Sequence, residues 1–266
     1  MKYVVDHDLH IHTFLSSCSR NPKQNPEFLL EYARENNLKR ISVTDHFWDD
    51  AMGEASSWYE KQNFAHISSI LPLPKTADVE FLFGCEGEIR KDLTLGISKE
   101  NLEKLDMIVI PTTHMHMKGF TVSSDGSESS EERGRLWCDR LEAVLNMDLP
   151  FRRVGIAHLA CYLIDKRSDS DYIAALSAIP EDRMTELLSK AAELCVGIEL
   201  NADDIRLGEK FGDPIMRIFR RAKECGCKFY LGSDSHHPEE FRGVINRFEN
   251  VIDALSLTED DKFIPA

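Results

Sequence analysis

The stretch DLHIH at residues 8–12 follows a short β-branched run and places two histidines two residues apart. Side chains at positions i and i+2 of a strand point to the same face, so we expect His10 and His12 to lie side by side with Asp8 behind them. Packing requires no imidazole at the end of an apolar strand, whereas two imidazoles can bind one metal ion. An H-x-H pair is also compatible with an ordinary hydrogen-bonded pair, so its meaning depends on the other ligands that the chain supplies.

Six further β-branched runs follow this one, and helical segments separate them. Parallel strands joined by crossover helices produce this alternation, so the sequence predicts an α/β fold. The predicted strands are residues 3–12, 39–46, 79–89, 106–114, 153–158, 196–202 and 227–236. The predicted helices are residues 26–37, 56–71, 99–104, 131–147, 182–194, 213–224 and 239–255. No long break interrupts the pattern, which favours a single domain over residues 1–266.

Two predicted loops are longer than a compact α/β domain requires. One covers residues 116–134 after the fourth strand and is rich in Ser and Gly, and the other covers residues 159–182 after the fifth. Loops of this length are either lids and binding loops or tolerated surface insertions. The sequence leaves both interpretations open.

The composition limits the classes of function. The 266 residues are 42% hydrophobic, which allows a sizeable core, and the formal net charge is -14. This charge argues against a general nucleic-acid-binding protein, because phosphate backbones are bound by an excess of Lys and Arg. The N-terminus lacks the pattern of a secretory signal, no apolar run approaches the roughly 20 residues of a membrane span, and the seven cysteines show no C-x-x-C pair. We therefore expect a cytoplasmic protein that binds small molecules or cations.

Most of the histidines fall at one kind of position. Eight of the ten lie at or just beyond the C-terminal end of a predicted strand: His10, His12, His46, His114, His116, His158, His236 and His237. In a parallel barrel these strand ends converge on one face, where active sites are built from the strand ends and the following loops. Histidines without a common role would be distributed over helices and loops. The distribution therefore predicts a shared site.

Carboxylates occupy the same strand ends. Glu86 and Glu88 end the third predicted strand, Asp45 precedes His46, and Asp234 stands two residues before the histidine at position 236. Histidine combined with carboxylate suits Zn, Mn, Fe and similar first-row ions. The number of ligands exceeds what one ion requires, which indicates two or three clustered divalent ions.

At these residues the sequence resembles the PHP family, the polymerase and histidinol phosphatase domain. The matching stretches are DLHIH at 8–12, SVTDH at 42–46, GCEGEI at 84–89, PTTH at 111–114, GIAH at 155–158 and LGSDSH at 231–236. They span nearly the whole chain, and their combination and order are specific. The resemblance implies a distorted (β/α)7 TIM-like barrel that forms one domain over residues 1–266. It also implies a two- or three-metal site and phosphoesterase activity.

The resemblance also implies roles for individual residues. The implied metal ligands are His10, His12, His46, Glu86, His114, His158, Asp234 and His236. Glu86 is implied to bridge two ions, and Glu86, Asp234 and His236 are the residues assigned to catalysis. Asp8 and Asp45 resemble partners that orient imidazoles from behind. Glu88 and His116 rank second to Glu86 and His114, and His237 is interpreted as a loop or substrate contact.

One position departs from the family pattern. Many relatives place a further ligand, often His or Asp, about six residues after the opening pair, and this chain has Cys18 there. Cysteine can ligate zinc, but it can equally be a core thiol. The number of ions therefore stays at two or three.

The implied reaction is hydrolysis of a phosphate ester by a hydroxide that bridges the metal ions. A phosphate also requires cationic contacts, and five basic residues lie in loops after strand ends: Arg20, Lys118, Lys166, Arg167 and Arg206. Arg20 and Arg167 are the best placed of these. Histidinol phosphate is a natural candidate substrate, although no residue pattern identifies an imidazole-binding pocket.

Two other functions remain open. An amidohydrolase also begins with H-x-H on a barrel strand, but its two-metal members usually bridge the ions with a carboxylated lysine on the fourth strand, and the fourth strand here contains no lysine. A non-catalytic, metal-binding regulatory barrel is the other alternative. Polymerase-linked proofreading is disfavoured by the acidic charge and by the lack of a polymerase region in this sequence.

Overall fold

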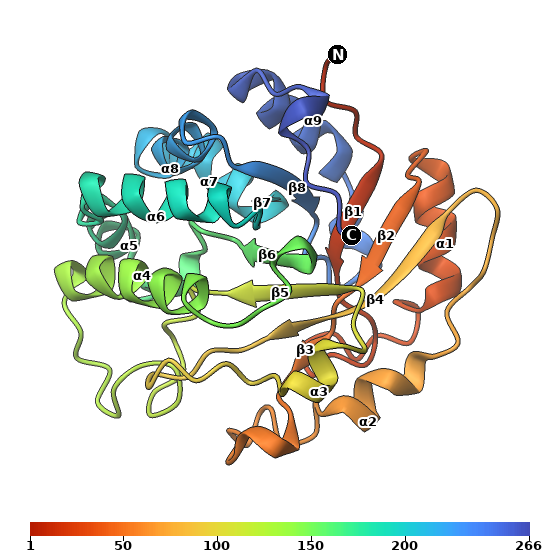
Figure 1. The fold of residues 1–266 in the computed structure, drawn as a ribbon, viewed down its shortest axis with the longest axis horizontal. Helices are drawn as coiled ribbons and strands as arrows, with labels where there is room; N and C mark the ends of the chain where they lie inside the picture. Colours follow the sequence, from red (N-terminus) through yellow and green to blue (C-terminus); the bar gives the residue numbers. More distant parts are fainter.

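The apolar runs form parallel strands arranged as a distorted barrel in the computed structural model, which describes residues 1–266 (Figure 1). The strands are β1 (His7–Ile11), β2 (Arg40–Val43), β3 (His46–Phe47), β4 (Glu80–Gly87), β5 (Met107–Pro111), β6 (Val154–Ala157), β7 (Gly197–Asn201) and β8 (Lys228–Gly232). Neighbours follow the order β1-β2-β4-β5-β6-β7-β8, and β3 pairs with β4. The seven predicted strands are present, and β3 continues the path of β2 after a break at Thr44 and Asp45. The predicted α/β barrel is thus confirmed.

Backbone hydrogen bonds beyond the end of β8 nearly close the barrel. The Asp234 N–H donates to the His10 carbonyl at 2.7 Å, and the His12 N–H donates to the Ser235 carbonyl at 3.2 Å. The first and last strands of the chain therefore lie side by side. This closure brings the first and the last of the sequence motifs, near residues 10 and 234, close together.

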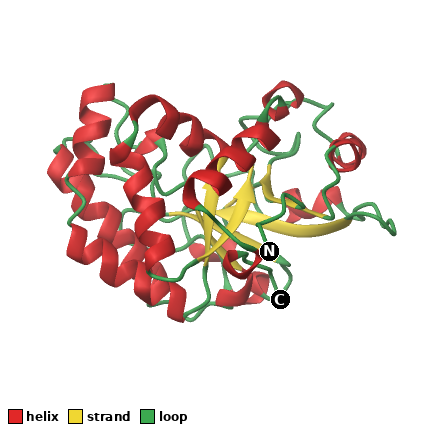
Figure 2. Ribbon diagram, turned by 90° about the horizontal axis from the view of Figure 1, so that it is seen from above, coloured by secondary structure: helices red, strands yellow, loops and turns green.

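Nine helices accompany the strands. They are α1 (Pro26–Glu35), α2 (Phe64–Ile67), α3 (Lys99–Leu102), α4 (Ser130–Leu145), α5 (Asp169–Ser177), α6 (Glu181–Glu193), α7 (Ala202–Phe211), α8 (Asp213–Glu224) and α9 (Val244–Leu255). Figure 2 shows the helices outside the strands, most densely on one side, and Figure 1 shows that α4, α5, α6 and α8 lie on this side. None of them combines the length and apolar character that spanning a lipid bilayer requires.

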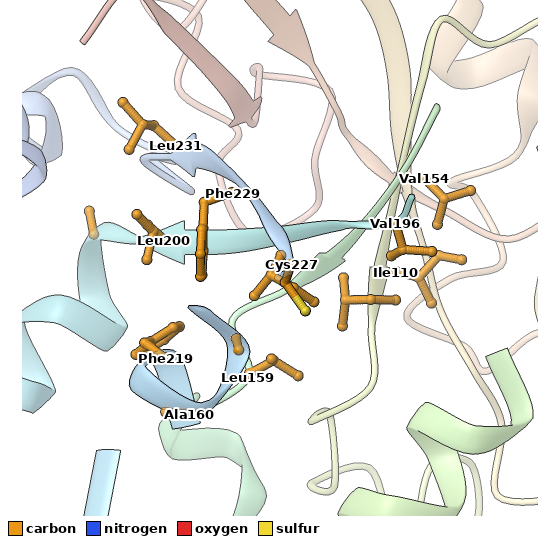
Figure 3. Close-up of a cluster of buried hydrophobic side chains, with 14 of the residues drawn as sticks. Ile110, Val154, Leu159, Ala160, Val196, Leu200, Phe219, Cys227, Phe229 and Leu231 are labelled. Carbon is orange, nitrogen blue, oxygen red and sulfur yellow. The ribbon is translucent and has the colours of Figure 1, made fainter. Parts of the chain in front are cut away.

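Two of the three apolar clusters support this arrangement. The larger one fills the space between strands and helices, and Figure 3 shows part of it, where Leu200 of β7 and Phe229 of β8 lie near Phe219 of α8. The smaller one comprises Leu9, Leu82, Met107, Val109, Ala157, Tyr230 and Phe263. A Cβ atom at Gly155 would lie 2.5 Å from the Tyr230 ring, so the glycine makes room for the aromatic side chain. Apolar side chains thus fill the interior of the barrel, and polar side chains occupy the C-terminal ends of its strands.

The helix predicted over residues 56–71 is wrong for most of its length. Only Phe64–Ile67 is α-helical, and the preceding residues form turns in which the Gln62 carbonyl accepts from the Trp48 N–H at 2.9 Å. These turns hold Tyr59 in the interior, where its hydroxyl donates to Glu88. Tertiary contacts of the aromatic side chains therefore override the helical pattern.

Two helices were not predicted. The Ser168 side chain caps α5 by accepting from the Asp171 N–H, and the Asn201 side chain caps α7 directly after β7. Gly212, with φ of 73°, then separates α7 from α8. The Ser cap followed by acidic residues was a readable signal for α5. The helix α7 was missed because no loop separates it from the preceding strand.

Candidate metal centre

All eight candidate ligands lie at the C-terminal mouth of the barrel. His10 lies in β1, His46 in β3 and Glu86 in β4, and the others lie within four residues after the end of β1, β5, β6 or β8. Their donor atoms form three groups, each with all ligand atoms within 4.8 Å of one another: His12, His46 and His236; His10, His12 and Asp234; Glu86, His114 and His158. Segments far apart in the sequence thus bring imidazoles and carboxylates to one place. That these residues bind metal stays a prediction.

Glu86 lies at the centre of the groups. Its Oε2 atom is 2.7 Å from His46 Nδ1 and 3.5 Å from His12 Nε2, whereas its Oε1 atom is 3.1 Å from His158 Nε2. The side chain is 1% exposed, so water does not solvate either oxygen. Its two oxygens therefore face different sets of imidazoles, which is the arrangement of a carboxylate that bridges two cations.

The residues present fit divalent cations. His46 Nδ1 and Glu86 Oε2 are both buried and lie close together, yet neither has a hydrogen bond of acceptable geometry. A buried polar atom without a partner costs about 1–3 kcal/mol. A cation bound between imidazole nitrogens and carboxylate oxygens would satisfy both atoms, and this donor set matches the preferences of zinc and related ions.

Burial and neighbouring carboxylates have opposite effects on the pKa values of the histidines in the cluster. Burial disfavours charge on His10, but Glu199 and Asp234 raise its pKa well above the usual value. Burial acts in the same way on His158, and Glu86 raises the pKa of that ring to about 9. For His12 burial prevails, and together with the neighbouring His236 and His46 it keeps the pKa well below the usual value. In the metal-free molecule, protons therefore occupy part of the cluster.

Glu199 of β7 supports two of the candidate ligands and was not predicted. Its Oε1 atom lies 2.7 Å from His10 Nδ1, and its Oε2 atom accepts from the His158 backbone N–H at 2.7 Å. A Cβ atom at position 232 would lie 1.9 Å from Glu199 Oε1, so Gly232 provides the space for this carboxylate. An acidic residue between two apolar residues of a strand, Ile198 and Leu200, was the signal that sequence reasoning overlooked.

Glu88 and Thr113 support two further imidazoles. Glu88 Oε2 lies 2.8 Å from His114 Nδ1, and Thr113 Oγ1 lies 3.0 Å from His158 Nδ1. The buried Arg140 guanidinium is 3.5 Å from the other oxygen of Glu88. Glu88 thus orients His114 and belongs to none of the three donor groups.

The two aspartates predicted to orient imidazoles differ. Asp45 accepts from Ser16 Oγ at 2.6 Å, and that hydroxyl lies 2.9 Å from His12 Nδ1, so Asp45 acts on the ring through Ser16. The prediction for Asp8 is wrong, because its carboxylate accepts from the Ser233 N–H and the Tyr32 hydroxyl and from no imidazole. The pairing of β1 with β2 shifts register between Asp8 and Ile11, which ends the simple same-face alternation.

A cavity of about 440 Å³ opens above the donor groups. Its lining residues are Cys18, His46, Trp58, Tyr59, Glu86, His114, His116, Met117, His158, Cys161, Leu163, Asp234 and His236. Cys18 is exposed at the cavity rim. Partial desolvation there disfavours its thiolate, but interactions with His236 and His46 lower the pKa of the thiol to about 7. Cys18 thus lies at the edge of the cluster. His116 belongs to the cavity wall, and His237 does not line the cavity.

The predicted phosphate contacts lie elsewhere. Neither Arg20 nor Arg167 lines the cavity, and no Lys or Arg does. The side chain of Arg20 points to solvent. Arg167 is held by Asp165, whose Oδ1 atom accepts from Arg167 Nε at 2.8 Å. The positions of the two arginines therefore do not support the predicted phosphate contact. For Arg167, sequence position alone does not reveal the competing ion pair with Asp165.

Comparisons with known proteins support the fold. No family model matches the sequence, and no curated protein matches it. A crystal structure of histidinol phosphate phosphatase from Lactococcus lactis is similar with a TM-score of 0.60 and 16% identity, covering 97% of this chain and 98% of that chain. A probable 2-pyrone-4,6-dicarboxylic acid hydrolase from Acinetobacter baumannii (TM-score 0.48, 14% identity, 97% of each chain) and an ochratoxinase from A. niger (TM-score 0.38, 10% identity, 95% of this chain and 69% of that chain) are more distant. At such identities the likeness concerns the fold alone.

Proposed function

We propose that residues 1–266 form one domain that hydrolyses a small phosphate ester with the help of two or three divalent ions. The observation that carries this proposal is the position of Glu86, whose two oxygens face separate groups of imidazoles at the mouth of the barrel. The similar fold from Lactococcus lactis, which was crystallised with zinc, L-histidinol and phosphate, supports the choice of reaction.

The candidate ligands would hold the ions, and the surrounding residues fix them for that role. Divalent ions clustered in such a site activate water near neutral pH and neutralise phosphate oxygens. Glu199 holds Nδ1 of His10, which leaves Nε2 of that ring free for ligation. The His236 Nδ1–H donates to the Asp234 carbonyl at 2.8 Å, so its Nε2 atom carries the lone pair. Zn, Mn or Fe would suit these ligands.

A second candidate reaction is hydrolysis of a carbonyl substrate, as in amidohydrolases. One observation favours it: the cavity contains no Lys or Arg that could bind a phosphate. A carbonyl group carries no formal charge and requires no such contact. In the phosphate reaction the ions themselves would have to neutralise the phosphate, which is feasible for a cluster of two or three divalent cations.

The test is a comparison of phosphate release with carbonyl hydrolysis. The purified protein is loaded with Zn or Mn, its metal content is measured, and it is assayed against a panel of phosphate esters and a panel of amides and lactones. We expect phosphate release only. Turnover of the carbonyl panel alone would replace the proposal by its rival, and turnover of neither would overturn both.

A ligand variant connects the activity to the cluster. His10→Ala is expected to lower phosphate release by more than about a hundredfold, since removing even an outer partner of a ligand costs 10- to 100-fold. His66→Gln is the matched control, because His66 lies in α2 and bonds only to a backbone carbonyl. Circular dichroism checks that both variants are folded. Undiminished activity of folded His10→Ala would remove the opening histidine pair from the reaction.

A further inference from the structure

The wall of the cavity beyond the candidate ligands is apolar and aromatic. It is formed by Trp58, Tyr59, Met117, Cys161 and Leu163. The Trp58 ring meets the His46 ring edge to face with centroids 4.8 Å apart, and Trp58 and Tyr59 are 4.6 Å apart. An aromatic surface therefore begins directly beside the donor cluster, where the organic part of a bound ester would lie.

The wall offers no free partner for a charged group of the substrate. No Lys or Arg lines the cavity, so within its walls a substrate carboxylate would find no cation apart from the bound ions. The charge of Lys166 acts on His116 from outside these walls. The two carboxylates of the cavity, Glu86 and Asp234, belong to the donor groups that would hold the ions, so neither is free to pair with a substrate ammonium. A substrate ammonium would lose its water without gaining an ion pair, which is unfavourable.

One polar atom of the wall is available. His116 Nδ1 is buried and has no hydrogen-bond partner. The His116 ring stands at 88° to the His114 ring with centroids 5.4 Å apart, so it borders the donor cluster beside His114. A single neutral hydrogen-bonding group of a ligand could satisfy it. The wall thus matches a ligand that is mainly apolar with at most one polar contact.

Building on the proposed function, we infer that the substrate is a phosphate ester of an uncharged aromatic alcohol whose ring packs against Trp58. Aromatic rings gain from both burial and ring-to-ring contact. The cavity volume of about 440 Å³ lies within the range of small-molecule sites. This assignment excludes histidinol phosphate as the preferred substrate, because histidinol carries an amino group that is cationic at neutral pH.

The test compares three esters that all release an alkyl alcohol, so the leaving groups are similar. They are 2-phenylethyl phosphate, with a neutral ring; histidinol phosphate, with a ring and an ammonium; and glycerol 3-phosphate, with neither ring nor cation. For the metal-loaded protein we expect kcat/KM for 2-phenylethyl phosphate to exceed each of the others about tenfold or more, the effect of burying one ring. Equal values, or a preference for histidinol phosphate, would overturn this inference and leave the proposed function standing.

Variants at Trp58 locate the preference. Trp58→Ala is expected to reduce the ratio of kcat/KM between 2-phenylethyl phosphate and glycerol 3-phosphate toward one, at unchanged metal content. Trp58→Phe should retain most of the ratio, and Leu71→Ala, at an apolar side chain that is exposed and outside the cavity, should retain all of it. A folded, metal-loaded Trp58→Ala protein with the original ratio would overturn the assignment of Trp58. Absence of turnover of all three esters by the wild type would overturn the proposed function and this inference together.

Discussion

At the scale of single residues, the centre depends on carboxylates that do not themselves face the candidate metal positions. His10 is fully buried, and its Nδ1 atom lies against Glu199. That contact selects the tautomer in which Nε2 is free, and Nε2 is the atom that lies 3.4 Å from Asp234 Oδ1. His114 depends on Glu88 in the same way. Removing such a partner is expected to weaken metal binding without removing a ligand.

We therefore predict that Glu199→Gln lowers metal affinity about 10- to 100-fold. The amide is isosteric with the carboxylate, but it is neutral and no longer stabilises positive charge on His10 when an ion is bound. Competition with a chromophoric chelator measures the affinity. The control is Glu209→Gln on the exposed face of α7, which should bind as the wild type does. Equal affinity of Glu199→Gln and wild type would contradict the role assigned to Glu199.

At the scale of elements, the junction of β8 with β1 determines the geometry. The Ser233 N–H donates to Asp8 at 2.9 Å, and the Asp234 N–H donates to the His10 carbonyl. These bonds fix the segment after β8 against β1 and thereby place Asp234 beside His12. The junction is tight, because Gly232 faces both Glu199 and His10.

The prediction at this scale is that Gly232→Ala is destabilising and also impairs metal binding. The added Cβ atom would lie 1.9 Å from Glu199 Oε1 and 2.8 Å from His10 Cβ, so both side chains must shift. Overpacking of this kind typically costs about 1–3 kcal/mol in the free energy of unfolding. Urea unfolding of the metal-free protein and chelator competition measure the two effects.

A second substitution tests the cause of the Gly232→Ala effect. Glu199→Ala removes the carboxylate that the new methyl group would contact. If the two positions act on each other, the loss of stability in the double variant is smaller than the sum of the single losses. Strictly additive losses would show that Gly232 does not act through Glu199.

At the scale of the whole molecule, proton binding and metal binding compete. The barrel gathers several histidines and carboxylates in a buried space, and in the metal-free state the pKa values of His10, His46 and His158 are all raised, mainly because nearby carboxylates outweigh the effect of burial. With a pKa of about 9, His158 is protonated at pH 7. Ligation requires the neutral imidazole, so an incoming ion must displace this proton.

We predict that metal uptake at pH 7 releases protons and that the apparent affinity rises with pH up to about 9, where His158 loses its proton in the metal-free site. As the pH falls below about 9, His158 holds its proton more firmly against the ion, so metal and activity are expected to be lost progressively toward acid pH. Calorimetric titration in two buffers of different ionisation enthalpy measures the number of protons released. Uptake without proton release at pH 7, or activity that persists at pH 4 in the presence of a chelator, would contradict this linkage.

Local patterns in the sequence predicted the architecture and the gathering of the candidate ligands at one place. The alternation of apolar runs with helical segments predicted all seven strands of the barrel. The positions of His10, Glu86 and Asp234 at strand ends predicted that these side chains meet, because parallel strands in a barrel end on the same face. Helix bounds were less accurate where a strand runs directly into a helix, as at Asn201, or where aromatic side chains turn inward, as at Tyr59.

Only the tertiary structure decided which side chains support the centre and what its cavity accepts. Glu199 contacts His10 across 189 positions of the chain, and Arg167 is drawn away from the cavity by Asp165. Such contacts depend on distances between elements, which no local spacing encodes. The sequence determines what each strand end carries, whereas the closure of the barrel determines which of those groups meet and which apolar surfaces enclose them.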